Sequence, residues 1–133
     1  MNSTLKRGAA LVALLAVAAG CGGDDGGSSP VAGPLRVVVT SPNTDDGAVM
    51  FQVTGVVDSV TVPAGLTLHQ SAPGPNVIRA IVTGNISSGG TLLTLHVPDV
   101  SKASSIATQV IQVAARSTYA MRPAGAYSLT VQK

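Results

Sequence analysis

The chain has 133 residues, of which eight are Lys or Arg and six are acidic, so its formal charge at pH 7 is only +2. Such a small net charge gives no support to a nucleic-acid-binding function, which needs a clustered basic face. With a single cysteine in the chain, a disulfide framework is excluded, and that cysteine cannot complete a metal site alone.

The first 23 residues have the pattern of an export signal. Lys6 and Arg7 precede an apolar run over residues 8–20, and small residues follow it. As a helix this run would extend about 20 Å, which is short of the about 30 Å hydrocarbon core of a bilayer. The segment is therefore predicted to direct export rather than to span a membrane.

The end of this signal, Ala19-Gly20-Cys21, resembles the signal of bacterial lipoproteins. The resemblance implies cleavage before Cys21 and lipid attachment to its thiol, so residues 1–20 would be a signal peptide and the mature chain tethered to a membrane. Gly22 after the cysteine resembles the pattern of delivery to the outer membrane. We therefore expect a lipid-anchored protein of the cell envelope, on the outer rather than the inner membrane. An ordinary secretory signal or an uncleaved amphiphilic helix is the alternative.

The sequence after the signal divides into a linker and one domain. Residues 21–33 hold the cysteine and a Gly-, Ser- and Asp-rich stretch with almost nothing to bury, which predicts a flexible linker. Residues 34–133 hold 16 Val and 11 Thr against 7 Leu, a bias that favours strands. Without residues 1–20, six basic residues balance six aspartates, so the mature chain has no net charge.

Apolar and polar residues alternate in short segments between turn signals along this domain. Strands are predicted at residues 35–40, 48–54, 56–62, 66–70, 77–83, 91–97, 109–114 and 126–132, with loops at 71–75 and 85–90. Residues 100–108 are predicted as a helical turn or an irregular crossover, and residues 116–125 as a long loop. Phe51, Leu129 and Val131 are expected to face the core, together with Tyr127. This spacing predicts an all-β fold, an antiparallel β-sandwich of about eight strands.

Three pieces of the domain are similar to cohesin-type modules, which are β-sandwiches related to some carbohydrate-binding domains. They are Asp46-Gly47-Ala48-Val49, residues 79–82, and Ser88-Gly89-Gly90-Thr91 with the Leu-rich strand to residue 95. The resemblance implies an Ig-like or cohesin-like sandwich that binds a protein partner. The chain departs from that family in having no glutamate and in the long loop at 116–125. The resemblance therefore does not extend to a dockerin-type partner.

Candidate metal ligands are few. His69 and His96 could form a metal pair on neighbouring strands with Asp58 or Asp99 as a third ligand, but exposed strand histidines are the expectation. Asp45-Asp46-Gly47 could hold calcium through carboxylate oxygens, but the same residues make a good hairpin turn, and a turn is predicted. We therefore expect no metal and no cofactor.

No catalytic constellation is recognisable. Serines are plentiful, but no Gly-x-Ser-x-Gly motif lies between a strand and a helix, and no carboxylate pair for glycoside hydrolysis is indicated. The chain is therefore predicted to be a non-enzyme.

The longest loop carries Arg116, Tyr119 and Arg122, residue types that are enriched in protein interfaces. They are candidate partner contacts. The favoured expectation, however, is that Tyr119 closes the end of the sandwich and that the arginines are solvated. A protein-binding or structural module is predicted, with an envelope protein as partner. Carbohydrate binding is the second hypothesis. It is weakened because Phe51 and Tyr127 are expected in the core, which leaves Tyr119 alone as an aromatic side chain for a sugar platform.

Overall fold

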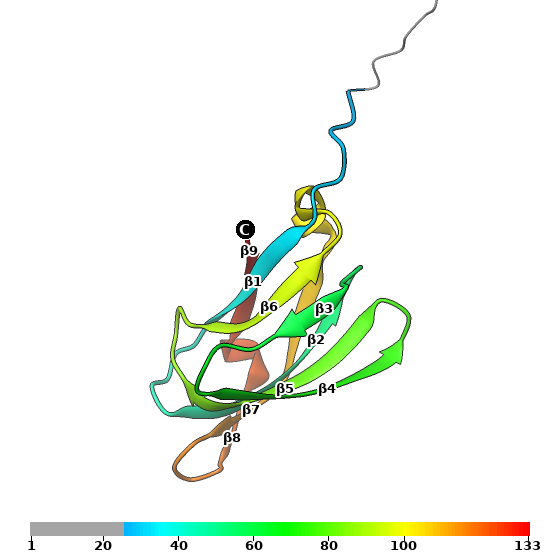
Figure 1. Cartoon of the computed structure of the whole chain (residues 1–133). Helices are drawn as coiled ribbons and strands as arrows, with labels where there is room; N and C mark the ends of the chain where they lie inside the picture. The colour runs from blue at the N-terminus through cyan, green and yellow to red at the C-terminus, as the bar shows by residue number, and fades with distance from the viewer. Residues whose placement is uncertain (1–25) are drawn as a thin grey trace, which may run out of the picture.

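Two antiparallel sheets pack face to face in the computed structural model, which describes residues 26–133 (Figure 1). In spatial order, the four-stranded sheet contains β3 (Ser59–Thr61), β6 (Thr91–Val97), β1 (Gly33–Thr40) and β9 (Ser128–Gln132). The five-stranded sheet contains β4 (Leu66–Gly74), β5 (Val77–Ile86), β2 (Asp46–Thr54), β7 (Ala107–Ala115) and β8 (Met121–Arg122). The predicted all-β sandwich is confirmed. The predicted signal peptide and Cys21 lie outside the described residues.

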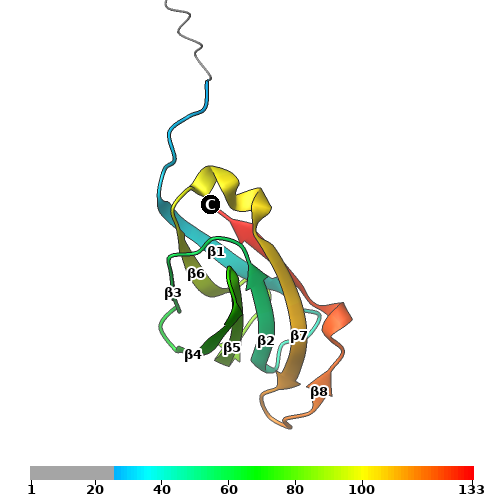
Figure 2. The same cartoon turned by 90° about the vertical axis from the view of Figure 1, so that its right-hand side faces the viewer.

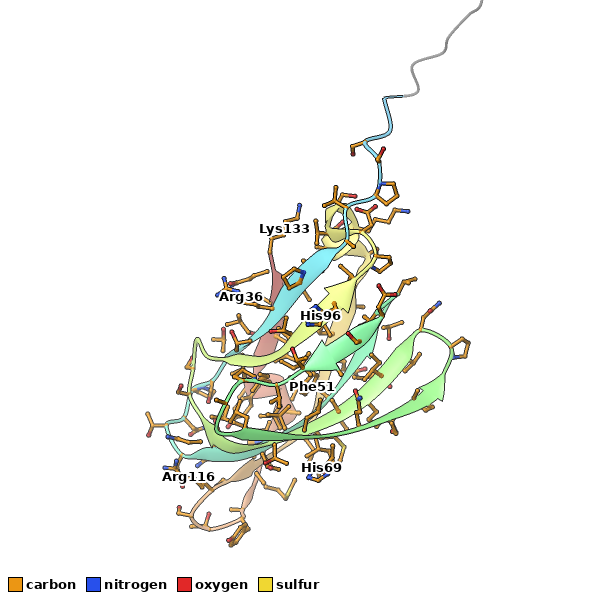
Figure 3. The ribbon with its side chains drawn as sticks, viewed as in Figure 1. Arg36, Phe51, His69, His96, Arg116 and Lys133 are labelled. Atoms are coloured by element: carbon orange, nitrogen blue, oxygen red, sulfur yellow. The ribbon has the colours of Figure 1, made fainter. Side chains whose placement is uncertain are left out.

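Alternation along β2 builds the centre of the core. Val49, Phe51 and Val53 are at most 1% exposed, because successive side chains of a strand point to opposite faces of the sheet. Phe51 lies opposite Ala80 of β5 and Val110 of β7, so it is flanked on both sides by strands of the same sheet. Figure 3 shows Phe51 in the interior of the sandwich. The predicted core face of this strand is confirmed.

Several strands begin or end at other residues than predicted. The strand expected at residues 56–62 is reduced to the three residues of β3, and residues 71–74, expected as a loop, belong to β4. Pro73 is accommodated there because β4 is an edge strand, where one backbone donor is not needed for the sheet. Residues 100–108 contain the 3₁₀ helix η1 (Val100–Ser105). The long loop contains β8 and the 3₁₀ helix η2 (Ala124–Ala126), so the described residues form nine strands rather than eight.

The sandwich has two distinct ends, seen in two views at right angles (Figures 1 and 2). The proximal end is where β1 begins at Gly33, next to η1 and to the C-terminus. The distal end is opposite and carries the β1–β2 loop (residues 41–45), the β5–β6 loop (87–90) and the β7–β8 hairpin. Residues 26–32 therefore approach the proximal end, and this described part of the entering chain does not cover the distal end.

The described residues contain no helix with the length and apolar character needed to cross a bilayer. Residues 26–32 are exposed and outside any strand, and Val31 accepts a hydrogen bond of 2.8 Å from the backbone N–H of Val100 in η1. This bond attaches the entering chain to the proximal end of the sandwich.

Candidate functional site at the distal end

Asp46 is a fully buried carboxylate at the distal end. It is 0% exposed and begins β2, where it lies opposite Ile86 of β5 and Ala115 of β7. The prediction that Asp45-Asp46-Gly47 forms a hairpin turn is therefore wrong. The loop at residues 41–45 instead carries the chain from the four-stranded to the five-stranded sheet, and Asp46 is already a strand residue.

Five side chains form what we call the Asp46 cluster: Ser41, Asn43, Asp46, Arg122 and Tyr127. The Tyr127 hydroxyl donates to Asp46 Oδ1 at 2.7 Å and accepts from Asn43 Nδ2 at 2.8 Å. The Ser41 hydroxyl donates to Asp46 Oδ2. A buried carboxylate needs such donors, because desolvation of an unpaired charge is costly. The cluster joins the β1–β2 loop, β2, β8 and the segment that enters β9.

Arg122 supplies the positive charge of the cluster. Its Nε lies 3.4 Å from Asp46 Oδ1, and its side chain is 24% exposed. Within the described residues this buried Nε has no hydrogen-bond partner, so its interaction with Asp46 is mainly electrostatic. Arg122 was a candidate partner contact, and the structure directs its charge inward instead of toward solvent.

Asp45, the neighbouring acid, forms a separate and more exposed cluster. Its carboxylate lies 3.5 Å from Arg116 Nε and accepts hydrogen bonds from the hydroxyl and backbone N–H of Ser117. Arg116 also donates to Asn85 Oδ1 at 2.5 Å. Gly47 permits this approach, since a Cβ there would lie 2.6 Å from the Arg116 Cα. Arg116 is thus engaged with its own fold while its side chain stays 48% exposed.

The hydrogen bond from Ser117 holds the pKa of Asp45 below its usual value of 3.8, and Arg116 lowers it further. In the same way, the hydrogen bonds from Ser101 lower the pKa of Asp99 at the start of η1. A lowered folded-state pKa means that the unfolded chain takes up protons first as the pH falls. Both groups therefore contribute stability above about pH 4 that is lost below it.

Burial raises the pKa of the Tyr127 phenol above its usual 10.0, and its hydrogen bond to Asp46 raises it further. The unfolded chain then loses this proton first, so the free energy of unfolding should fall as the pH rises above about 10. Tyr127→Phe removes this ionisation. We expect urea unfolding from about pH 9 to about pH 11 to show a smaller stability loss in this variant than in the wild type. Equal slopes would contradict a buried, neutral Tyr127.

Tyr119 lies at the tip of the β7–β8 hairpin and is 82% exposed. Its φ is +56°, a left-handed conformation that is unfavourable for a bulky residue. Two hydrogen bonds fix the tip, from the Tyr119 N–H to the Ala115 carbonyl at 3.1 Å and from the Ala115 N–H to the Ala120 carbonyl at 2.9 Å. The expectation that Tyr119 closes the end of the sandwich is therefore wrong. Tyr127, only 7% exposed, has that position.

The two histidines are not brought together. His69 lies on β4 of the five-stranded sheet and His96 on β6 of the four-stranded sheet, and Figure 3 shows them apart. His96 Nε2 is 3.4 Å from Thr61 Oγ1, while the backbone N–H of Asp58 bonds to the carbonyl of His96. Across residues 26–133, no group of three or more His, Cys, Asp or Glu side chains is placed to hold a metal ion.

The three candidate partner contacts thus have different environments in and beside the distal hairpin. Arg122 pairs with a buried carboxylate, Arg116 with an exposed one, and Tyr119 extends into solvent. Met121, 56% exposed, adds a second apolar side chain to the hairpin. No family model, curated protein or solved structure matches the chain.

Proposed function

We propose that this chain is a lipid-anchored protein of a bacterial cell envelope, and that its sandwich binds another envelope protein through the distal hairpin. Lipid attachment would be at Cys21, following the lipoprotein-like signal. Because the chain enters at the proximal end, an anchor there would leave the distal end facing away from the membrane. The proposal assigns no catalytic step and no cofactor to the chain.

The conformation of Tyr119 is the observation that carries the binding proposal. A left-handed tyrosine costs of order 1–2 kcal/mol, and this strain persists only where the surroundings hold it. Here two backbone hydrogen bonds hold it, and the ring is left in solvent, where it contributes little to the core. An exposed aromatic side chain on a backbone that is held in place is well suited to bind a partner, since tyrosine has few rotamers to lose.

Protein is a better fit than carbohydrate as the partner. Sugar platforms rely on several exposed aromatic rings, but Phe51 and Tyr127 are buried in the sandwich. Tyr119 is the one aromatic side chain that the described residues expose, and Met121 beside it is a residue type enriched in protein interfaces. A glycan array separates these hypotheses, since a specific glycan hit lost on Tyr119→Ala would favour carbohydrate.

Cys21→Ser tests the anchor. Serine offers no thiolate for lipid attachment, so the variant should lose its membrane tether and leave the detergent phase in phase-partitioning experiments. A protein attached through two or more acyl chains stays bound to a membrane, because each buried CH₂ contributes about 0.8 kcal/mol. Equal partitioning of wild type and Cys21→Ser into detergent would contradict the lipoprotein assignment.

Tyr119→Gly tests the hairpin. Glycine adopts the left-handed conformation without strain, so the variant should be more stable by about 0.5–1 kcal/mol in urea unfolding. Partner binding should nevertheless be lost, because the aromatic contact is gone. A photo-crosslinking amino acid in place of Tyr119 should capture an envelope protein in living cells, whereas the same group at the exposed, proximal Arg36 should not. Equal capture at both positions would contradict a distal binding site.

A further inference from the structure

β4 forms one edge of the five-stranded sheet. Within residues 26–133, β5 is the strand that pairs with it, and no strand covers its other side. In an antiparallel pair, every second residue directs its backbone N–H and C=O away from the partner strand. β4 is also the most solvent-exposed of the long strands, with six of its nine residues exposed. Apart from the Leu66 N–H, which donates to the Pro63 carbonyl at 3.2 Å, its outer edge therefore offers a row of unpaired donors and acceptors.

The other edges of the sandwich have protection that β4 lacks. β3 and β8 are only three and two residues long, and β9 lies beside β7 of the facing sheet (Figure 2). Sheets protect their edges with short strands, bulges, prolines and charged side chains. In β4 the register shift and Pro73 come only after Ser71, and residues 66–70 pair regularly with β5. No Lys, Arg, Asp or Glu occurs between residues 59 and 78.

We infer that residues 66–70 pair with the same strand of a second copy of this chain, antiparallel about a two-fold axis, and join two five-stranded sheets into one. An unpaired strand edge requires an extended partner with a free edge of its own, and a second copy provides an edge of equal length. Neutrality of the segment removes the like-charge repulsion that opposes pairing of identical strands. An uncharged segment also offers no charge that could select a strand of another protein with the opposite charge.

The pairing keeps each side chain on its present face. With a two-fold axis perpendicular to the sheet, Leu66 and Leu68 stay on the core side, where both pack against the hydrophobic core, while Thr67 and His69 stay on the solvent side. A cleft of about 360 Å³ opens beside this edge, between β4 and β3. Val57, Val60 and Ile78 line part of it, and Asp58 places one carboxylate there. The second copy would cover the rim of this cleft.

Such an interface is small, so the dimer should be weak, with a dissociation constant in the micromolar range or above. A cysteine scan is the most direct test. In a Cys21→Ser background of the full chain, Thr67, Leu68, His69 and Gln70 are each replaced by cysteine and oxidised. At the two-fold axis one residue faces its own copy with the Cα spacing that a disulfide needs, and its neighbours point to the opposite face.

One scan position should therefore form dimers at least about tenfold more than the adjacent positions and more than Gln132→Cys on β9. Uniform or background crosslinking at all positions would overturn the proposal. Sedimentation of the unoxidised chain gives a second measurement. Gln70→Lys should weaken association about tenfold, whereas Gln132→Lys should not.

A wild-type chain that stays monomeric at near-millimolar concentration would also overturn self-pairing, and would leave the edge to a strand of another protein or to solvent. Because the scan is done without Cys21, its outcome is independent of the lipid anchor, and it does not involve Tyr119. Failure of this proposal and failure of the proposed function are thus separate results.

Discussion

Phe51→Ala is expected to lower the free energy of unfolding by about 3–5 kcal/mol. The ring is fully buried, and Ala80 and Val110 on the flanking strands are too short to fill the space that its removal leaves. Phe51 is also the chain's single phenylalanine and one of the largest fully buried side chains of the core. For a domain with a total stability of about 5–15 kcal/mol, this loss is a large fraction.

Met50→Ala provides the matched control for this experiment. Met50 is adjacent in the same strand but points to the opposite face of the five-stranded sheet, where it is only partly buried. Its truncation should cost about 1 kcal/mol or less. Both changes in the free energy of unfolding are to be measured by urea unfolding at neutral pH, with circular dichroism as the signal. A cost at Met50 equal to that at Phe51 would mean that the faces of β2 had been assigned the wrong way round.

Most strands could be predicted because one face of each is buried. In β2, Val49, Phe51 and Val53 alternate with partly exposed residues, and this period of two is visible in the sequence alone. In β6 the same period of two holds for Leu93, Leu95 and Val97, which face the core, although the adjacent Leu92 is buried as well. Burial on one side therefore determined both the existence of these strands and their orientation.

The edges of the sheets could not be predicted in the same way. Residues 71–74 contain Pro73 and Gly74, which favour a loop in any local analysis, but at an edge they continue β4. Conversely, residues 56–62 contain four valines, a residue type that favours strands, and yet only Ser59–Thr61 pair with β6. Pairing at an edge depends on whether a neighbouring strand lies within reach, and local sequence does not contain this information.

The distal site was only partly predictable. Arg116, Tyr119 and Arg122 were identified by residue type, since arginine and tyrosine in a long loop are unusual in a chain with few charges and few aromatics. Their different environments depend on Asp45 and Asp46, which are more than 70 residues away in sequence. Asp46 was missed because Asp-Asp-Gly is typical of turns, and the partner that buries it, Tyr127, is 81 residues away.

One sequence signal did point to the Asp46 cluster. A tyrosine at the start of a strand, predicted to face the core, needs a hydrogen-bond partner for its hydroxyl, and few acids exist in this domain. Tyr127 could therefore have been linked to one of four aspartates. The choice among them required the register of β2 and β9 on opposite sheets, which the structure supplies.

Replacing Asp46 by alanine is expected to destabilise the fold by about 3–5 kcal/mol, the usual cost of removing one partner of a buried ion pair. The variant leaves the buried Nε of Arg122 without its counter-charge and the Tyr127 hydroxyl without an acceptor. Asp46→Asn should cost less, about 1–3 kcal/mol, because the amide can still accept from Tyr127 while the charge is lost.

Asp45→Ala is the control, since it removes the adjacent carboxylate from a solvent-exposed ion pair. Such pairs contribute little, because water screens them and their side chains lose entropy on pairing. Unfolding of both variants in urea at neutral pH should therefore show a large loss for Asp46 and a small one for Asp45. Similar losses would mean that burial does not distinguish the two acids.

A double-mutant cycle isolates the interaction between Asp46 and Arg122. Arg122→Met removes the charge but keeps an apolar side chain of similar length, so in the Asp46→Ala background it should restore part of the lost stability. In the wild-type background the same change leaves Asp46 buried without its positive partner and should be destabilising. This reversal of sign is expected only if the two charges interact directly across the 3.4 Å between Arg122 Nε and Asp46 Oδ1. Strictly additive effects would contradict the interaction and would assign the stability of the distal end to Tyr127 and Ser41 alone.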